Sequence, residues 1–423
     1  MKKKKAILII SALDYWSLGD GKGGPALYKT LTVYSENGWN VYFVTGNKRD
    51  DINDDIAKNI HVIRFMTPSF LSYLMKIKEI SFIVRLIWWL HFQMRAFIEA
   101  YKISRIAKID VIYGYEVDAM PVAKVISLIL GVPLVARFQG TSYGVFWEGK
   151  RLKFIRAWEH AVGLRIPADL IIMTNDGTQG DRVLQGLGIN TSKVCFWMNG
   201  VDWDLFDRAP QYQRAKVALG LDNYHVVLCI SRLVSWKRVD RAVKCIKGVV
   251  EKCPDALLVI VGDGPELERL ENLALKLGVS EYVRFVGAVP HTEIPTYLAA
   301  ADIFLSLYDF SNLGNPLLEA MIAGRCIVTI NNGDTGNIIV NGVNGILLEE
   351  EELDRLPSII IDLLQNETFR DRLGKGAYEF AKANFWSWDE RIGAEIESIN
   401  RLIMKQSSGS FLNKICCKPE GEG

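Results

Sequence analysis

The sequence predicts an α/β protein built from two doubly wound, Rossmann-like domains. Short apolar runs alternate with helical patterns through both halves, as they do where helices cover a parallel sheet. The 423 residues, 49% of them hydrophobic, are enough for two or three domains with sizeable cores. Residues 1–200 carry 26 Lys and Arg against 17 Asp and Glu, whereas the rest carries 24 against 32. Unless this is ordinary scatter, it favours two domains, the basic one facing an anionic surface.

The first half opens with a βαβ unit whose first turn is rich in glycine. An apolar run at 6–12 predicts a buried strand, and Pro25 begins a helix that reaches Asn37. Between them, Gly23 and Gly24 would let a phosphate approach the backbone at the helix N-terminus, although such pairs are common in ordinary turns. Further strands are expected at 40–45, 111–113, 133–138 and 170–174.

The second half repeats the alternation more clearly. Strands are expected at 226–231, 256–261, 282–286, 302–306, 326–330 and 345–348. Helices are expected at 238–253, 265–277, 293–300 and 316–323. The predicted domains are 1–205 and 206–385, with a helix at 386–405 that returns to the first domain and a disordered tail at 406–423.

Residues 70–109 depart from a plain Rossmann pattern. They are rich in aromatic, aliphatic and basic residues, and 146–165 continue this character. At helical spacing they predict an amphipathic pair of helices that contacts an anionic membrane surface. The alternative is a helical hairpin packed on the sheet.

Other features favour a cytoplasmic protein. The basic start is followed by an apolar run of about seven residues, which is short for a signal peptide and lacks a small-residue cleavage site. No stretch has the roughly 18 apolar residues of a membrane span. The seven cysteines, an odd number in mostly apolar runs, are typical of a reducing compartment, and with the scattered histidines they form no metal-binding pattern.

The stretch YDFSNLGNPLLEAMIAG (308–324) predicts an anion site at the start of a helix. Pro316 is expected at the first helical position, which leaves free N–H groups at the helix mouth. Glu319 is expected in the first turn of this helix. It either complements the helix dipole or accepts hydrogen bonds from two adjacent hydroxyls, as in a ribose.

Two cations follow the first strand of the second half. Arg232 and Lys237 lie in one strand-to-helix loop, where both can reach a diphosphate unless they are simply solvated surface residues. The helix mouth and Glu319 follow another strand of the same domain. Because parallel strands end at one edge, these groups should meet there, and the edge suits a nucleoside diphosphate.

Motifs in this half resemble those of the retaining GT-B glycosyltransferases of glycosyltransferase family 4. They are NGVD (199–202), SRLVSWKRVDRAV (231–243), LLVIVGDGPELERL (257–270), VRFVGAVPHTEIPTYLAAADIFLSLY (283–308), GNPLLEAMIAGRCIV (314–328) and NGVNGILL (341–348). In the first half, Gly23 and Gly24 with the helix at 26–39 resemble the first glycine loop and helix of the family, and the resemblance is strong over 195–390 and weak over 50–195. The resemblance implies two Rossmann-like domains facing a central cleft.

The resemblance also implies roles for single residues. Arg232 and Lys237 would bind the donor diphosphate, and Glu319 would bind its ribose. The other donor-side positions are Gly23, Gly24, Asn199, Val289, Asp309, Asn312, Leu313, Gly314 and Asn315. No metal is implied, since the cations and the helix mouth would neutralise the leaving diphosphate.

Two positions depart from the family pattern. Ser311 stands where the family usually has a second glutamate that holds the donor sugar, and Gln139 stands where it often has a histidine. Glutamine can hydrogen-bond a sugar but does not titrate. Gln139, Arg137 and Glu116 are the candidates for the acceptor side.

The predicted function is retaining transfer of a sugar from a nucleoside diphosphate sugar, UDP-linked by preference or GDP-linked. The acceptor would be a glycan or lipid-linked glycan of cell-surface polysaccharide synthesis, at the inner face of the membrane, with no nucleic acid partner. The alternative is an inactive relative that binds nucleotide sugar or lipid as a scaffold. A sugar-nucleotide epimerase of the same architecture is a further alternative.

Overall fold

The computed structural model describes residues 4–13, 26–46, 57–66, 81–141, 143 and 158–408, and the statements below concern these residues. The chain divides into two compact units. The first comprises Met1–Asn175, Gln179–Trp197 and Trp388–Gly423, and the second comprises Asp176–Thr178 and Met198–Ser387. The predictions for Gly23, Gly24, 70–80, 146–157 and 409–423 fall outside the described residues.

The first unit contains a seven-stranded parallel sheet in the order β3-β2-β1-β4-β5-β6-β7. Its strands are β1 (Ala6–Ser11), β2 (Asn40–Thr45), β3 (Ile60–Arg64), β4 (Val111–Tyr115), β5 (Leu134–Phe138), β6 (Leu170–Thr174) and β7 (Val194–Trp197). All residues of β1, β4, β5 and β6 are buried, as expected for apolar strands covered on both faces. The edge strands β3 and β7 are short, and only part of each is buried.

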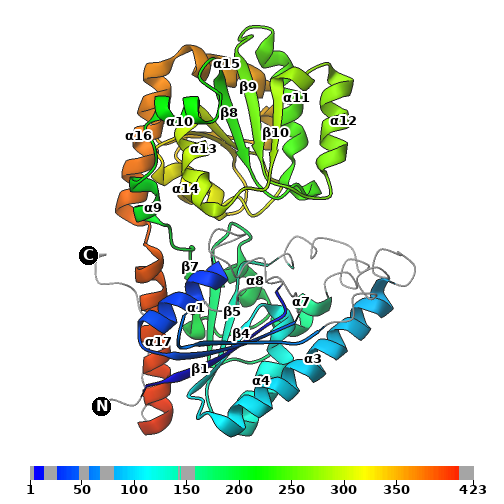
Figure 1. Cartoon of the computed structure of the whole chain (residues 1–423), viewed down its shortest axis with the longest axis vertical. Helices are drawn as coiled ribbons and strands as arrows, with labels where there is room; N and C mark the ends of the chain where they lie inside the picture. Colours follow the sequence, from blue (N-terminus) through cyan, green and yellow to red (C-terminus); the bar gives the residue numbers. More distant parts are fainter. Residues whose placement is uncertain are drawn as a thin grey trace. The chain divides into compact units, whose positions relative to one another are not determined.

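Helices cover both faces of this sheet (Figure 1). Helices α1 (Ala26–Glu36) and α17 (Trp388–Ser408) pack on the side chains of Ile7 and Ile9. The opposite face, with Leu8 and Ile10, packs against α3 (Ser81–Ile106), α4 (Met120–Leu130), α7 (Trp158–Gly163) and α8 (Gly180–Gly186). From residue 81 onward, the segment predicted as a helix pair is one 26-residue helix, α3.

The second unit contains a six-stranded parallel sheet in the order β10-β9-β8-β11-β12-β13. Its strands are β8 (His225–Ile230), β9 (Ala256–Val261), β10 (Val283–Gly287), β11 (Ile303–Ser306), β12 (Cys326–Ile330) and β13 (Ile346–Leu348). Each begins and ends within one residue of the expected range. The sequence was informative here because each strand is a short apolar run bounded by turn residues.

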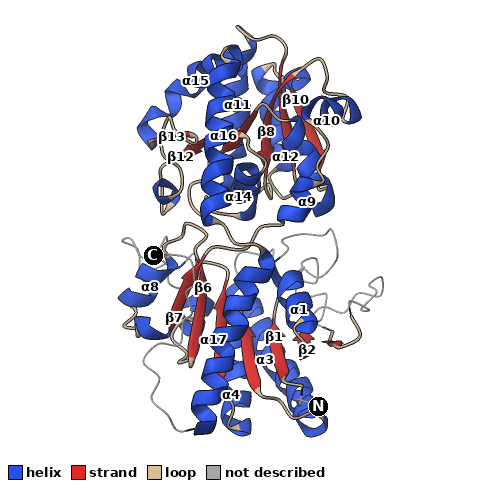
Figure 2. Cartoon of the chain, turned by 90° about the vertical axis from the view of Figure 1, so that its left-hand side faces the viewer, coloured by secondary structure: helices blue, strands red, loops and turns tan. Residues whose placement is uncertain are grey.

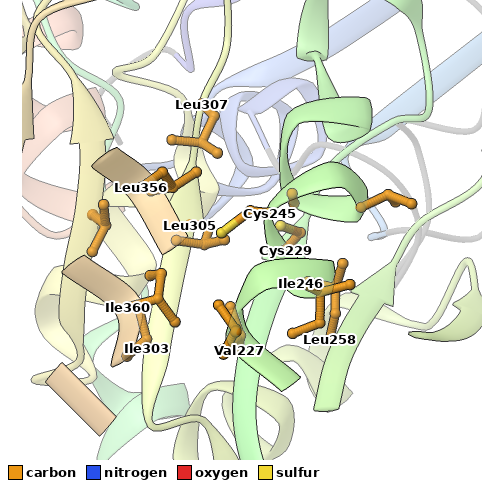
Figure 3. Packing of buried hydrophobic residues seen from close by; sticks show 14 of the residues in the cluster. Val227, Cys229, Cys245, Ile246, Leu258, Ile303, Leu305, Leu307, Leu356 and Ile360 are labelled. Atoms are coloured by element: carbon orange, nitrogen blue, oxygen red, sulfur yellow. The ribbon is translucent and has the colours of Figure 1, made fainter. Parts of the chain in front are cut away.

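Helices also cover both faces of the second sheet (Figure 2). One face carries α11 (Val239–Val250), α12 (Leu267–Leu277) and α15 (Leu356–Gln365), and the other carries α10 (Tyr212–Ala218), α13 (Ile294–Ala300), α14 (Asn315–Ile322) and α16 (Glu367–Asn384). Figure 3 shows strand residues such as Val227 and Leu305 meeting Ile246 of α11 and Ile360 of α15. Each such buried side chain contributes about 1.5–3 kcal/mol, which makes this core a rigid support for the loops above it.

Within the described ranges, no helix is long and apolar enough to cross a membrane. The same residues include no cluster of three or more His, Cys, Asp or Glu side chains that could hold a metal ion.

Candidate functional site

The candidate site lies at the carboxyl edge of the second sheet, where β8 and β11 are neighbours. The chain leaves β8 toward β9 on one side and reaches β11 on the other, so this is a topological switch point of the kind that binds ligands. The loop after β8 is held against Gly262, where an added Cβ would lie 1.8 Å from the carbonyl oxygen of Ser231. Only glycine allows this close approach, which fixes the loop that carries Arg232 and Lys237.

Lys237 joins the two loops of the edge. Its Nζ lies 3.5 Å from the carbonyl oxygen of Ser311, which belongs to the turn after β11. The ammonium group also lies 3.7 Å from the ring centroid of Tyr308 and 4.2 Å from that of Trp236. The predicted meeting of the two loops is therefore present in the structure.

The surroundings of Lys237 disfavour its charged form. Burial lowers the pKa of Lys237 to about 7; the Asp176 carboxylate opposes this shift, and the nearby Arg232 adds to it. The Arg232 side chain is exposed. One loop thus presents the exposed guanidinium of Arg232 beside the ammonium of Lys237, whose charge the Asp176 carboxylate balances only in part. An anionic ligand would stabilise this pair of cations.

The helix mouth is formed by the N-terminus of α14. Gly314 is its N-cap and provides no side-chain cap. Pro316 has no N–H, and the N–H of Leu317 donates to the carbonyl oxygen of Gly314 at 3.0 Å, so the N–H of Asn315 is the donor of the first helical residues that is left to a ligand. The helix begins at Asn315, one residue earlier than expected, and Pro316 is its second residue. Glu319 is consequently the fifth residue and lies outside the first turn, so the expectation of a first-turn carboxylate was wrong.

Glu319 has a partner that the sequence analysis missed. Its side chain is 8% exposed, and Oε1 lies 2.8 Å from Nε2 of His291, in the loop after β10. The available signal was the position of His291, shortly after a predicted strand end of the same edge. In that loop, Val289 packs against the core of the unit. Asn199 donates from Nδ2 to Oδ1 of Asn315 at 2.9 Å, which places it beside the helix mouth.

The turn after β11 uses several of its candidate groups internally. Oδ1 of Asp309 lies 3.0 Å from both Arg238 and Arg241. The amide of Asn312 is fully buried, and its oxygen and nitrogen each serve two hydrogen bonds within the turn and to Asn332. Asn312 therefore shapes the turn and offers no free amide to a sugar, which removes it from the direct donor contacts.

Ser311 takes a left-handed conformation, with φ of 59°. The Ser311 hydroxyl donates to Oδ2 of Asp176 at 2.7 Å. The N–H of Leu313 donates to the backbone carbonyl oxygen of Asp176 at 3.0 Å. Asp176 belongs to the second unit, and burial raises the pKa of its carboxyl. The side chain of Leu313 is buried, so Leu313 could contact a ligand only through its backbone.

In the first unit, two acceptor-side candidates lie at the ends of β4 and β5. Oε1 of Glu116 accepts the N–H of Gln139 at 2.8 Å, and Nε2 of Gln139 donates to the hydroxyl of Tyr115 at 2.9 Å. Glu116 has φ of 68° and ψ of 164°, a strained conformation for a residue other than glycine. Such strain is concentrated at functional sites in many proteins.

Arg137 is in the interior of the first unit. Its side chain is 1% exposed and donates from NH1 to Oε2 of Glu395 in α17 at 2.9 Å. Tyr34 and Tyr113 donate to the other oxygen of that glutamate. This buried ion pair fixes α17 to the sheet, and it removes Arg137 from the acceptor-side candidates.

Comparison with known proteins connects this geometry to a family. Residues 212–380 match the family model Glycosyl transferases group 1. Over 208 residues the chain is 32% identical to the GDP-mannose-dependent alpha-(1-6)-phosphatidylinositol monomannoside mannosyltransferase of Mycolicibacterium smegmatis, covering 47% of this chain and 54% of that protein. It is 25% identical over 300 residues to the sulfoquinovosyl transferase SQD2 of Arabidopsis thaliana, covering 67% and 56%. The chain thus spans about half the length of the mannosyltransferase relatives it matches.

Solved structures share this fold over more than nine-tenths of the chain. HepE of Anabaena in complex with UDP and glucose superposes with a TM-score of 0.70 at 20% identity, covering 93% of this chain and all of that one. WaaG, a glycosyltransferase involved in lipopolysaccharide biosynthesis, gives a TM-score of 0.71 at 18% identity, covering 92% and 99%. The expected α/β fold, GT-B with two parallel sheets, is confirmed.

Proposed function

We propose, from the premise that the chain belongs to the Glycosyl transferases group 1 family through residues 212–380, that it is a retaining glycosyltransferase. It transfers a sugar from a nucleoside diphosphate sugar to a glycan or lipid-linked glycan. The observation that carries the proposal is the contact of the two loops at the switch point, where Lys237 reaches the turn before α14. Arg232, Lys237 and the α14 mouth supply three kinds of phosphate ligand at one sheet edge.

Each of these groups has a distinct part in the proposed reaction. The bond between the sugar C1 and the diphosphate oxygen breaks, and a bond from C1 to the acceptor oxygen forms on the same face. The acceptor proton passes to the leaving diphosphate. Arg232, Lys237 and the helix N-terminus stabilise the charge that develops there, so the reaction proceeds without a metal ion. Glu319 accepts hydrogen bonds from the ribose hydroxyls of the nucleotide.

The donor is proposed to be a UDP-sugar or a GDP-sugar. The mannosyltransferase relatives are GDP-mannose-dependent, which supports a guanosine donor, and the HepE complexes contain UDP or UDP-glucose, which supports uridine. A lipid-linked acceptor is supported by the phosphatidylinositol monomannoside on which those relatives act. In this chain, the choice between a UDP-sugar and a GDP-sugar is proposed to depend on the loop after β10, which includes Val289 and His291.

The enzyme is proposed to work at the inner face of a membrane through α3. Ile83, Ile87, Leu90 and Met94 recur on one side of this helix, and each is at least half exposed. The buried residues Phe92, Ala96 and Ala100 lie on the opposite side, against the sheet. An exposed apolar stripe on a helix that also carries Lys102 and Arg105 suits an anionic lipid surface.

The test of the donor site is thermal stabilisation by UDP, GDP, ADP and their sugar conjugates. A ligand at about 100 times its Kd should add roughly 2.7 kcal/mol to the free energy of unfolding. The shift should disappear in Glu319→Ala and persist in Glu281→Ala, a control at an exposed glutamate of the same unit. No shift with any nucleotide would overturn the proposal.

A scaffold without activity is the second candidate, and Ser311 and Gln139 favour it. The Ser311 hydroxyl is engaged by Asp176, and Gln139 is held by Glu116 and Tyr115. This candidate predicts a donor-induced thermal shift with no sugar transfer to any glycan or lipid-linked acceptor, whereas the enzyme shows both.

A further inference from the structure

Two aromatic rings enclose the ammonium group of Lys237 at the edge of the second sheet. Trp236 precedes Lys237 in the short turn Ser235–Lys237, and Tyr308 follows β11. The Nζ atom lies over both rings, 3.7 Å from the centroid of Tyr308 and 4.2 Å from that of Trp236. Both distances are within the about 6 Å at which a ring face attracts a cation. We call the two rings the Lys237 cage.

The rings have contacts of their own that hold them in place. Tyr308 is buried, and its hydroxyl donates to the last carbonyl oxygen of β8 at 2.9 Å. Trp236 stacks on Phe310, with ring centroids 4.5 Å apart and an angle of 16° between the ring planes. The carbonyl oxygen of Trp236 accepts the N–H of Asp309 at 3.0 Å, which joins the loop after β8 to the turn after β11. Contacts other than those with Lys237 therefore set the positions of both rings.

The ammonium is held by rings where a carboxylate would be the common alternative. Among the described residues, Lys237 forms no ion pair with a carboxylate, and its hydrogen-bond acceptor is the carbonyl oxygen of Ser311 at 3.5 Å. Asp176 attracts the ammonium from farther away, and Arg232 repels it. A carboxylate in contact would compete with a phosphate for the charge of Lys237. Ring faces carry no net charge, so they hold the ammonium and leave its charge available to a diphosphate.

We infer that Trp236 and Tyr308 are positioning residues for the proposed sugar transfer, and that they hold the Lys237 ammonium in place for the donor diphosphate. The inference rests on the proposed function, which assigns Lys237 to the leaving diphosphate. A lysine side chain loses much rotamer freedom when it is fixed. Because the cage fixes it before the nucleotide binds, this entropy is not lost on binding, and the cation already lies where negative charge develops.

The first measurement detects the cage in the full chain without nucleotide. In protein labelled with ¹³C-lysine, the protons next to Nζ of Lys237 should resonate upfield of those of exposed lysines, because ring currents shield protons above a ring face. The signal is assigned by its absence from Lys237→Met. Trp236→Leu keeps an apolar side chain but removes one ring, so it should move the signal downfield. A Lys237 signal at the position of exposed lysines in wild type would overturn the inference.

The second measurement is a double-mutant cycle on nucleotide affinity. In titrations with UDP and with GDP, Trp236→Leu should bind about tenfold more weakly than wild type, and Trp236→Phe, which keeps a ring face, should recover most of the loss. In the Lys237→Met background, Trp236→Leu should have little further effect, because the ring has no cation left to position. A tryptophan that only joined the two loops would weaken binding equally in both backgrounds. Trp203→Leu, at a partly buried tryptophan of α9 (Trp203–Asp207), is the matched control and should bind as wild type does.

The second ring is tested by a similar comparison. Tyr308→Leu removes the ring face and the hydroxyl, whereas Tyr308→Phe removes only the hydroxyl and its hydrogen bond to β8. Tyr308→Phe should therefore bind nucleotide more tightly than Tyr308→Leu. Equal losses in the two variants would show that the hydroxyl is the important group, and would overturn the positioning role of the Tyr308 ring.

Titration of Glu319→Ala with the same nucleotides keeps the two proposals apart. Suppose that wild type binds a nucleotide, that Glu319→Ala does not, and that Trp236→Leu either binds as wild type does or loses the same affinity with and without Lys237. The cage is then wrong and the proposed function stands. No nucleotide binding by wild type would overturn the proposed function and this inference with it, even where the Lys237 signal is shielded.

Discussion

His291 Nε2 lies 2.8 Å from Glu319 Oε1, and the two side chains are 15% and 8% exposed. The histidine comes from the loop after β10 and the glutamate from the second turn of α14, so the contact joins the two sides of the proposed nucleotide site. One carboxylate oxygen is committed to the imidazole. The other is left to accept hydrogen bonds from a ribose, and its direction is set by the histidine.

We therefore expect His291→Ala to weaken nucleotide binding through the ribose. Loss of the contact frees the carboxylate to rotate, and a displaced hydrogen bond to a charged acceptor is worth about tenfold in affinity. Titration with UDP or GDP and with the corresponding 2′-deoxynucleotide measures the effect. Wild type should prefer the ribonucleotide, and His291→Ala should bind both about equally.

The conservative variant His291→Gln supplies the control. A glutamine can donate to Glu319 from a similar position, so it should restore part of the preference for ribose. If His291→Ala discriminates between ribose and deoxyribose as well as wild type does, the positioning role of His291 is wrong.

Nucleotide binding should take up a proton through Lys237. Its pKa is lowered to about 7 in the empty protein, chiefly by burial, and a bound diphosphate would raise it by charge attraction. At pH 8, calorimetry in buffers of different ionisation enthalpy should show proton uptake and an affinity that falls as the pH rises. Lys237→Met should show neither.

The lowered pKa of Lys237 also determines how the free energy of unfolding changes with pH. A lysine with a depressed folded pKa binds its proton more weakly in the folded state, so the free energy of unfolding rises with pH between about 7 and 10.5. Lys237→Met should remove this rise and be more stable than wild type at pH 7. A Lys237→Met variant less stable than wild type at pH 7 would contradict this account of the site.

Removal of either phosphate cation should abolish most of the turnover. Arg232→Ala and Lys237→Ala each remove a group that stabilises the leaving diphosphate, and comparable losses cost roughly 10²–10³ in kcat. Initial rates of sugar transfer measure this, with Arg208→Ala as a control at an exposed arginine. Turnover like that of wild type in both variants would contradict their role.

Local patterns predicted most of the fold and only part of the site. The strands of the second sheet could be predicted because each is a short apolar run. The contact of Lys237 with the turn before α14 could be predicted because parallel strands end at one edge of a sheet. The strands β3 and β7 were not among the predicted strands, because Ile60–Arg64 and Val194–Trp197 are short edge strands with exposed positions. Such segments bury too little apolar surface to be distinctive.

The side-chain partners within each unit could not be predicted from the sequence. Glu395 lies 258 residues from Arg137, and nothing in either segment shows that α17 brings them together. Asn312 has the composition of a ligand-binding turn, yet the fold uses its amide to close the turn on itself. Which polar groups face a ligand depends on tertiary packing, and that information is absent from residue spacing.

Asp118 should make the stability of the protein depend on pH. Its pKa is raised in the folded state from 3.8 to about 6, so the folded state holds the proton more tightly. The associated stability is fully present below pH 3.8 and is lost as the pH rises through 6. Relative to wild type, Asp118→Asn should gain up to about 3 kcal/mol at pH 8 and almost nothing near pH 4. Urea unfolding at the two pH values measures this, and an equal difference at both would rule out the titration of Asp118 as its cause.

The exposed stripe of α3 should bind anionic vesicles. Leu90 is 53% exposed in the middle of that stripe, and insertion of its side chain among lipid chains would remove apolar surface from water. Leu90→Glu replaces it with a charge that anionic lipids repel. Co-sedimentation with phosphatidylglycerol–phosphatidylcholine vesicles should show binding by wild type that weakens with salt, and at least a tenfold loss in Leu90→Glu.

The second unit offers a matched control for that substitution. Leu275 of α12 is 70% exposed, and Leu275→Glu makes the same chemical change away from α3. If membrane binding depends on the α3 stripe, Leu275→Glu should bind vesicles as wild type does. Equal losses in the two variants would show that net charge controls the binding. No binding by wild type would remove the membrane role of α3 and leave the nucleotide site as proposed, because no step at the second sheet depends on α3.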